Sequence, residues 1–122
     1  MNRTFDKARE FMYRNARPLD LARFQYHFEN GSKYNVVNVL SYYQNEDGGC
    51  GHAIEADCWN PNSTPLHTAG ASDIIREIDF TDRNHSFVQG LLLQKNHLTN
   101  EYCLCIITLA SSVWRNLILA ET

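Results

Sequence analysis

The sequence predicts an all-α fold of about five or six helices that are paired through short turns. Three observations support this prediction. Apolar residues recur at intervals of three and four along most of the chain, as they do on one face of an α-helix. Asn, Gly and Pro residues stand where the apolar stretches begin or end. No segment shows the clear alternation of apolar and polar residues that is typical of a half-buried strand.

The size and composition fit a single domain, or a fragment of one, over residues 1–122. A chain of 122 residues with 43% hydrophobic residues can bury one core. The net charge of −3 argues against nucleic-acid binding as the main role. The charge is uneven, because residues 1–24 carry six basic and three acidic side chains. If these residues form a helix, its basic side is more often exposed to solvent than bound to a phosphate.

The start of the chain, MNRTFDKARE, lacks the apolar core of a secretory signal. The longest apolar run, residues 103–110, is far shorter than the ~20 residues of a membrane span. We therefore expect a cytoplasmic protein without a membrane span and with reduced cysteines. No two cysteines form a C-x-x-C pair, so the spacing indicates no dedicated zinc or redox motif, and we expect no cofactor. The four cysteines are Cys50, Cys58, Cys103 and Cys105.

Two helices are expected before residue 30. Thr4 is the expected N-cap of the first helix. Pro18 ends that helix or starts the second one, and Asn30 with Gly31 forms a C-terminal stop for the second. The apolar stripes consist of Phe5, Ala8, Phe11, Met12 and Ala16 in the first helix, and of Leu21, Phe24 and Phe28 in the second.

Ser32 is the expected cap of a third helix that ends near Gln44. A loop then occupies residues 45–64, which hold three glycines and few periodic apolar positions. Long loops in compact domains are often functional or unusually well tied down. The buried stripe of the third helix is expected to contain Val36, Val37, Leu40 and Tyr43.

Thr64 and Pro65 are the expected N-cap and first residue of a fourth helix. Thr81 or Asp82 is the expected cap of a fifth, which Gly90 weakens by up to about 1 kcal/mol relative to Ala. Residues 102–120 are apolar and fit either a helix or a strand. The apolar stripes contain Ala69, Ala71, Ile74, Ile75 and Ile78 in the fourth helix, and Phe87, Val88, Leu91 and Leu92 in the fifth.

The segment QNEDGGCG, residues 44–51, follows the third helix. Its three glycines permit backbone angles that are closed to other residues. Asp47 can accept hydrogen bonds from amides of the turn that it begins. The side chain of Gln44 has both a carbonyl and an amide, with which it can bridge two backbone segments. No Lys-Ser or Lys-Thr pair follows the glycines, which excludes a P-loop.

This segment resembles the Q-x-x-D-G-G-x-G repeat of squalene–hopene cyclases and protein prenyltransferase β-subunits, which share the α/α toroid fold of terpenoid cyclases. The resemblance covers residues 19–80. It implies a partial α/α toroid of helical hairpins, in which rings of helices surround an apolar cavity that holds an isoprenoid in active members. Residues 86–122 are then a divergent or truncated tail. The residues of the core motif are Gln44, Asp47, Gly48, Gly49 and Gly51, and those of the downstream match are Glu55, Asp57, Pro61, Ser63, Pro65 and Thr68.

Three departures from the family pattern bear on activity. Cys50 stands where the motif usually has an aromatic residue. The chain lacks the D-x-D-D motif with which cyclases of this fold protonate their substrate. Prenyltransferases bind zinc through an Asp and a Cys two apart and a His on another helix. Here Asp57 and Cys58 are adjacent, so a zinc site made of Asp57, Cys58 and His67 is the disfavoured alternative.

Four side chains of the loop are candidates for catalysis: His52, Asp57, Cys58 and His67. For the two histidines, hydrogen bonding that fixes the loop is favoured over catalysis. Glu55 and Asp57 lie on opposite sides of an extended segment, which does not suit a paired-carboxylate site. Asp57 is therefore expected to anchor the loop, and Cys58 needs a nearby base or helix N-terminus to act as a nucleophile.

Two functions remain open from the sequence. The chain is either a toroid module related to isoprenoid-acting enzymes and catalytically incomplete alone, or a non-catalytic helical module. The first would take an isoprenoid or another apolar small molecule. The second would bind a protein partner or an apolar ligand, or self-associate through exposed apolar helix faces. The missing acid motif favours the second for this chain.

Overall fold

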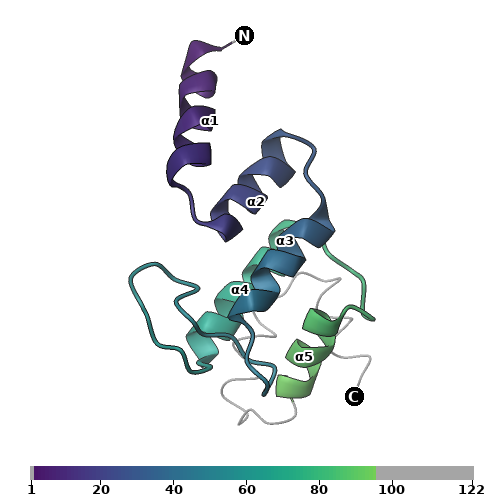
Figure 1. The fold of residues 1–122 in the computed structure, drawn as a ribbon. Coiled ribbons are helices and arrows are strands. Elements are labelled where there is room, and N and C mark those ends of the chain that lie inside the picture. The colour runs from purple at the N-terminus through teal and green to yellow at the C-terminus, as the bar shows by residue number, and fades with distance from the viewer. Residues whose placement is uncertain (1, 96–122) are drawn as a thin grey trace. The chain divides into compact units, whose positions relative to one another are not determined.

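The structure is a computed structural model that describes residues 2–95. Within this range the chain forms five α-helices and one 3-10 helix, and its only strand-like pairing is an isolated bridge (Figure 1). The prediction of an all-α fold is confirmed for this part of the chain. None of the described helices is long and apolar enough to cross a membrane. The predictions for residues 102–120, including Cys103 and Cys105, fall outside the described residues.

The chain divides into two compact units. The first is Met1–Leu40, and the second begins at Ser41. The boundary lies inside residues 19–80, the segment that carries the toroid resemblance.

Helix α1 (Arg3–Asn15) opens the first unit. Its N-cap is Asn2, whose Oδ1 accepts a hydrogen bond from the Thr4 amide at 3.0 Å. The prediction of Thr4 as the cap is therefore wrong, because Asn2 has the better cap side chain and stands two residues earlier, directly before the helix. Asp6 in the first turn and Arg14 in the last turn complement the helix dipole. No residue of α1 is buried.

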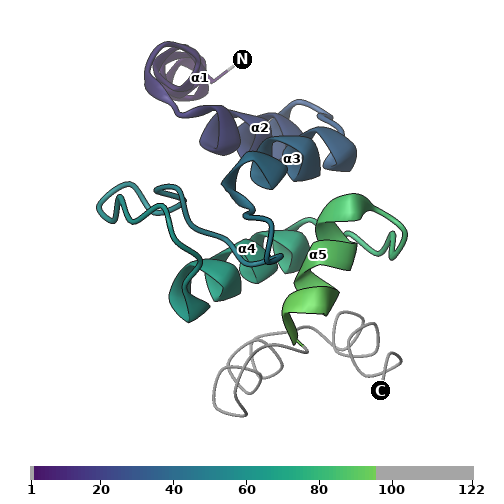
Figure 2. The ribbon, with the colours of Figure 1, turned by 60° about the horizontal axis from the view of Figure 1, so that its bottom comes forward.

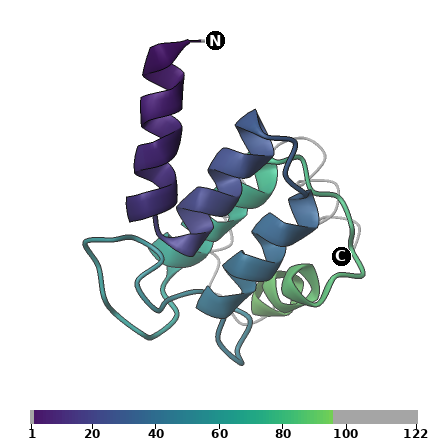
Figure 3. The same ribbon diagram turned by 45° about the horizontal axis from the view of Figure 1, so that its top comes forward.

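Helices α2 (Pro18–Phe28) and α3 (Lys33–Leu40) lie side by side (Figure 3). Pro18 is the first residue of α2, as predicted. After α2, the Gly31 amide donates to the Gln25 carbonyl at 2.8 Å, which closes the helix end. The Tyr34 amide donates to Ser32 Oγ at 3.1 Å, so Ser32 caps α3 as expected. The buried residues of α2 and α3 are Leu19, Ala22, Val36, Val37 and Leu40.

An aromatic and polar seam joins α1 to α2. The ring of Phe5 lies 6.1 Å from that of Phe24 and 5.8 Å from that of Phe28. The Glu29 carboxylate accepts hydrogen bonds from the Tyr13 hydroxyl and from Arg9. These two bonds, chiefly the one from Tyr13, lower the pKa of Glu29. The seam is largely exposed, so it orders α1 beside α2 without enclosing it.

The second unit contains η1 (Ser41–Tyr43), α4 (Pro65–Glu77) and α5 (Ser86–Lys95), with the long loop between η1 and α4. Figure 2 shows α4 and α5 next to each other. Thr64 Oγ1 accepts from the His67 amide at 3.1 Å, which confirms the predicted start of α4. The buried apolar residues of α4, the turn after it and α5 are Ala69, Ala71, Ile74, Ile75, Ile78, Phe80, Phe87, Val88, Leu91 and Leu92.

The start of α5 differs from the prediction. Asp82 accepts a hydrogen bond from the Asn84 amide and so shapes the turn before the helix. The cap is provided by His85, whose Nδ1 accepts from the Phe87 amide at 3.2 Å. The helix therefore begins at Ser86, and the prediction of Thr81 or Asp82 as its cap is wrong.

Candidate functional site

The segment 44–51 forms a tight turn closed by its own backbone. The Asn45 amide donates to the Gly49 carbonyl at 2.8 Å, and the Gly51 amide donates to the Tyr43 carbonyl at 2.9 Å. Gln44 and Cys50 form the isolated antiparallel bridge across it. Asp47 stabilises the turn as expected, since its Oδ1 accepts from the Gly49 amide at 2.8 Å.

The side chain of Gln44 joins this turn to α5. Its amide nitrogen donates to the Gly48 carbonyl at 3.0 Å and to the Phe87 carbonyl at 2.9 Å. The bridging role predicted for Gln44 is therefore observed, and its second partner lies in the first turn of α5. One side chain thus holds two backbone segments together.

Two glycines allow the turn and the helix to approach this closely. A Cβ on Gly90 would lie 2.4 Å from Gln44 Nε2. A Cβ on Gly48 would lie 2.0 Å from the Gly90 carbonyl oxygen, and Gly48 has a φ of 86°, which L side chains rarely adopt. Gly90 was expected only to weaken the fifth helix. An isolated glycine in an apolar helix can also indicate a packing reason for the missing side chain. This signal in the sequence could have identified Gly90 as a contact position.

The residues after the turn are tied back to it. Ser63 donates to Asp47 Oδ1 at 2.7 Å and accepts from Asn45 Nδ2 at 2.9 Å. The Cys50 amide donates to Thr68 Oγ1 at 3.0 Å, which links the turn to the first turn of α4. Ser63 and Thr68 belong to the downstream part of the toroid resemblance. In this structure both act as hydrogen-bond partners of the core motif.

His52 has the loop-fixing role that was favoured over catalysis. Its Nε2 is hydrogen-bonded to Asn45 Oδ1, and its backbone amide donates to the Asn60 carbonyl at 3.0 Å. The side-chain amide nitrogen of Asn45, Nδ2, donates to the Pro61 carbonyl at 3.1 Å. Asn45 is thus a hub of the loop, a role that the sequence did not reveal.

The prediction of an extended segment around Asp57 is wrong. The Cys58 amide donates to the Glu55 carbonyl at 3.1 Å, so residues 55–58 form a turn. The Asp57 side chain is exposed and has no hydrogen bond or ion pair to another described residue. The anchoring role predicted for Asp57 is therefore performed by Asn45 and Asp47 instead.

His67 also differs from its prediction. Its side chain is 1% exposed, and neither ring nitrogen has a hydrogen-bond partner within residues 2–95. The imidazole thus does not fix the loop; only its backbone amide does, through Thr64. Burial of an unpaired polar group carries an energetic penalty of about 1–3 kcal/mol.

The geometry does not assemble the disfavoured zinc site. Among the described residues, no group of three or more His, Cys, Asp or Glu side chains is placed to hold a metal ion. Asp57 is exposed, Cys58 is half-buried and His67 is fully buried. Beside the turn lies an open hollow of about 550 Å³ that is polar and acidic in character. It is lined by Asn45, Glu46, Asp47, Asn62 and Ser63.

Cys50 is a packed thiol, and burial together with the charge of Asp47 raises its pKa to about 12. We expect iodoacetamide at about pH 8 to alkylate Cys58 and to leave Cys50 unmodified in the folded chain. The thiolate fraction of Cys50 is lower by roughly a thousandfold than that of an ordinary thiol. Mass spectrometry of the digested protein measures both sites, and urea-unfolded protein, in which both should react, is the control. Equal labelling in the folded state would contradict the burial of Cys50.

A comparison of the sequence with protein-family models, curated proteins and solved structures finds no match.

Proposed function

We propose that this chain is a helical-hairpin module of the terpenoid cyclase and prenyltransferase toroid type, which holds an isoprenoid or another apolar molecule without converting it. The observation that carries the proposal is the double hydrogen bond of Gln44 to Gly48 and Phe87. It gives the first residue of the Q-x-x-D-G-G-x-G motif a definite architectural task, the joining of a turn to the next helix.

Other hydrogen bonds within the loop argue against catalysis by its polar side chains. Asp47 is engaged with Gly49 and Ser63, and His52 is engaged with Asn45. The polar motif residues are thus used to hold the backbone. Asp57 and Cys58 have no assembled base or metal-ligand partner in the described part of the chain. A general acid or a metal centre would have to be supplied from elsewhere.

Incubation of the full chain with farnesyl diphosphate, geranylgeranyl diphosphate and squalene tests the proposal. We expect calorimetric binding of at least one of these ligands and no product by mass spectrometry. Asp57→Asn and Cys58→Ser should leave the binding unchanged, because neither side chain is assembled into a site. Absence of binding to all three ligands would overturn the proposal. Turnover that Asp57→Asn abolishes would make the module an enzyme.

A second candidate is a non-catalytic module that binds a protein partner, and Trp59 favours it. The side chain of Trp59 is 81% exposed, while its indole N–H donates to the Ala56 carbonyl at 2.9 Å. An exposed tryptophan held in one orientation is typical of an interface hot spot. If the partner is a second copy, light scattering after size-exclusion chromatography will show a dimer that Trp59→Ser weakens. A monomer at all concentrations would count against self-association.

A further inference from the structure

The turn between α2 and α3 contains the pair Asn30-Gly31, and the geometry of the turn accounts for both residues. Asn30 has a φ of 57°, in the left-handed region that asparagine tolerates better than most residues. Gly31 approaches α2 so closely that an added Cβ would lie 2.8 Å from the carbonyl carbon of Gln25. A side chain at position 31 would therefore displace the backbone of α2. The turn thus favours an asparagine that is followed by a glycine.

This pair is also chemically labile, and Asn30 is the one asparagine of the sequence that precedes a glycine. The Gly31 nitrogen, once deprotonated, attacks Cγ of Asn30 and forms a new bond to it. The bond from Cγ to Nδ2 breaks, and ammonia leaves with the proton that the Gly31 nitrogen has lost. One water molecule then opens the cyclic succinimide at either of its two carbonyl carbons, which gives aspartate or isoaspartate. Glycine hinders the attack least, because it has no Cβ.

The fold leaves the Asn30 side chain exposed but engages the attacking nitrogen. The Gly31 amide donates to the Gln25 carbonyl at 2.8 Å, and the same oxygen accepts from the Glu29 amide at 2.9 Å. Loss of the Gly31 proton would break the first of these hydrogen bonds, so the closed turn disfavours the reactive anion. The reaction therefore requires the end of α2 to open, and helix ends open more readily than the core.

We propose that Asn30 is a site of spontaneous deamidation, which proceeds when the end of α2 opens and whose isoaspartate product prevents the turn from closing again. In isoaspartate the main chain runs through the former side chain, which lengthens the backbone by one methylene group. The Gly31 amide is then displaced from the Gln25 carbonyl. Ser32, which accepts from the Tyr34 amide and caps α3, follows directly and is displaced as well.

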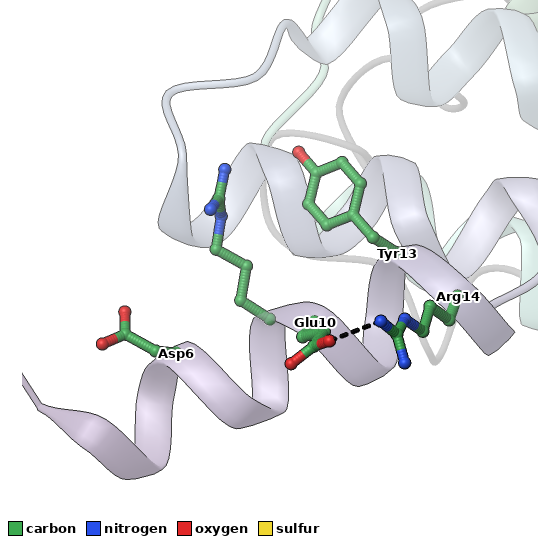
Figure 4. Close-up of a pocket in the computed structure, with 5 residues that line it drawn as sticks. Asp6, Glu10, Tyr13 and Arg14 are labelled. Carbon is green, nitrogen blue, oxygen red and sulfur yellow. Dashed lines mark ion pairs between the residues drawn. The ribbon is translucent and has the colours of Figure 1, made fainter.

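The residue before Asn30 connects this turn to α1. The Glu29 carboxylate accepts hydrogen bonds from the Tyr13 hydroxyl and from Arg9. Figure 4 shows the ring of Tyr13 projecting from α1, with the hydroxyl at its outer end. No residue of α1 is buried, so the helix depends on such surface contacts for its position beside α2. A turn that cannot close moves Glu29 and weakens this contact.

Peptide mapping by mass spectrometry of the full chain, kept folded at mildly alkaline pH, tests the proposal. We expect isoaspartate to form at position 30 before any other asparagine reacts. The urea-unfolded chain should react at least about tenfold faster at this position, because only the open fraction of the folded chain is reactive. Urea well below the unfolding transition should leave the folded rate unchanged, because opening of a helix end exposes little surface.

Three results would overturn the proposal. The first is an equal rate in the folded and the unfolded chain, which would show that the hydrogen bond of Gly31 does not restrain the reaction. The second is an unmodified folded chain at a time when the unfolded chain has reacted completely. The third is a folded rate that rises with urea as steeply as global unfolding does, because the end of α2 would then not open by itself.

Asn30→Gly is the matched control, because glycine adopts a positive φ freely and has no carboxamide. It should form no isoaspartate at this position and should keep its helices in circular dichroism. Asn30→Asp introduces the charge of the product without the additional methylene group, so its first unit should exchange amide hydrogens about as slowly as the wild type. The purified isoaspartate form should exchange them at least about fivefold faster. Equal exchange in the isoaspartate form and in Asn30→Asp would contradict the proposed effect on the turn.

Discussion

Gly48→Ala is expected to lower the free energy of unfolding by about 3 kcal/mol. The left-handed backbone of Gly48 alone penalises an L side chain by about 1–2 kcal/mol. The new Cβ would also lie 2.0 Å from the Gly90 carbonyl oxygen, a helix backbone atom that cannot rotate away. The resulting displacement adds roughly 1–3 kcal/mol. Urea unfolding followed by far-ultraviolet circular dichroism measures the difference.

The control for this variant is Gly70→Ala in α4. At Gly70 the nearest atom to an added Cβ is Glu55 Oε1, at an ordinary contact distance of 3.9 Å. The change should therefore stabilise the helix by up to about 1 kcal/mol. A Gly48→Ala protein as stable as the wild type would show that the turn does not approach α5 as closely as the structure places it.

The effect of Gly90→Ala on the free energy of unfolding is expected to change sign with the residue at position 44. In the wild type, the added Cβ would displace the Gln44 amide and disrupt its two hydrogen bonds, which together contribute about 2 kcal/mol. The gain in helix propensity offsets about 1 kcal/mol of this loss. The net result is a destabilisation of about 1 kcal/mol, although alanine normally stabilises a helix.

In a Gln44→Ala background, the same Gly90→Ala change should stabilise the protein by about 1 kcal/mol. The amide is then absent, so only the helix propensity remains. The double-mutant cycle thus carries a coupling energy of about 2 kcal/mol, measured by urea unfolding of all four proteins. Independent effects of the two substitutions would show that Gln44 does not meet α5 at Gly90.

The helices could largely be predicted from the sequence because their signals are local. Pro18, Ser32 and the Thr64-Pro65 pair mark helix starts through their own backbone and side-chain chemistry. The two wrong caps occur where several capable residues stand close together. Asn2 precedes Thr4, and His85 replaces the more usual cap residues near it.

The site could be predicted only in part, for a related reason. The roles of Asp47 and the turn glycines follow from short-range geometry, and the loop-fixing role of His52 follows from its polar neighbours. The helix that Gln44 contacts could not be predicted, because chain packing selects it. The burial of His67 has the same origin, since a histidine in the first turn of a helix is equally compatible with solvent.

The contact between Gln44 and Phe87 spans 43 residues of sequence, which has a consequence for synthesis on the ribosome. At about 5–20 residues per second, Phe87 is added roughly 2–9 seconds after Gln44. During that interval the nascent turn lacks the helix that completes it, and the carboxamide of Gln44 can bond only within the turn or to water. Replacing Gly48 or Gly90 should therefore affect the docking of α5 on the turn. The helices that emerge before α5 should be unaffected.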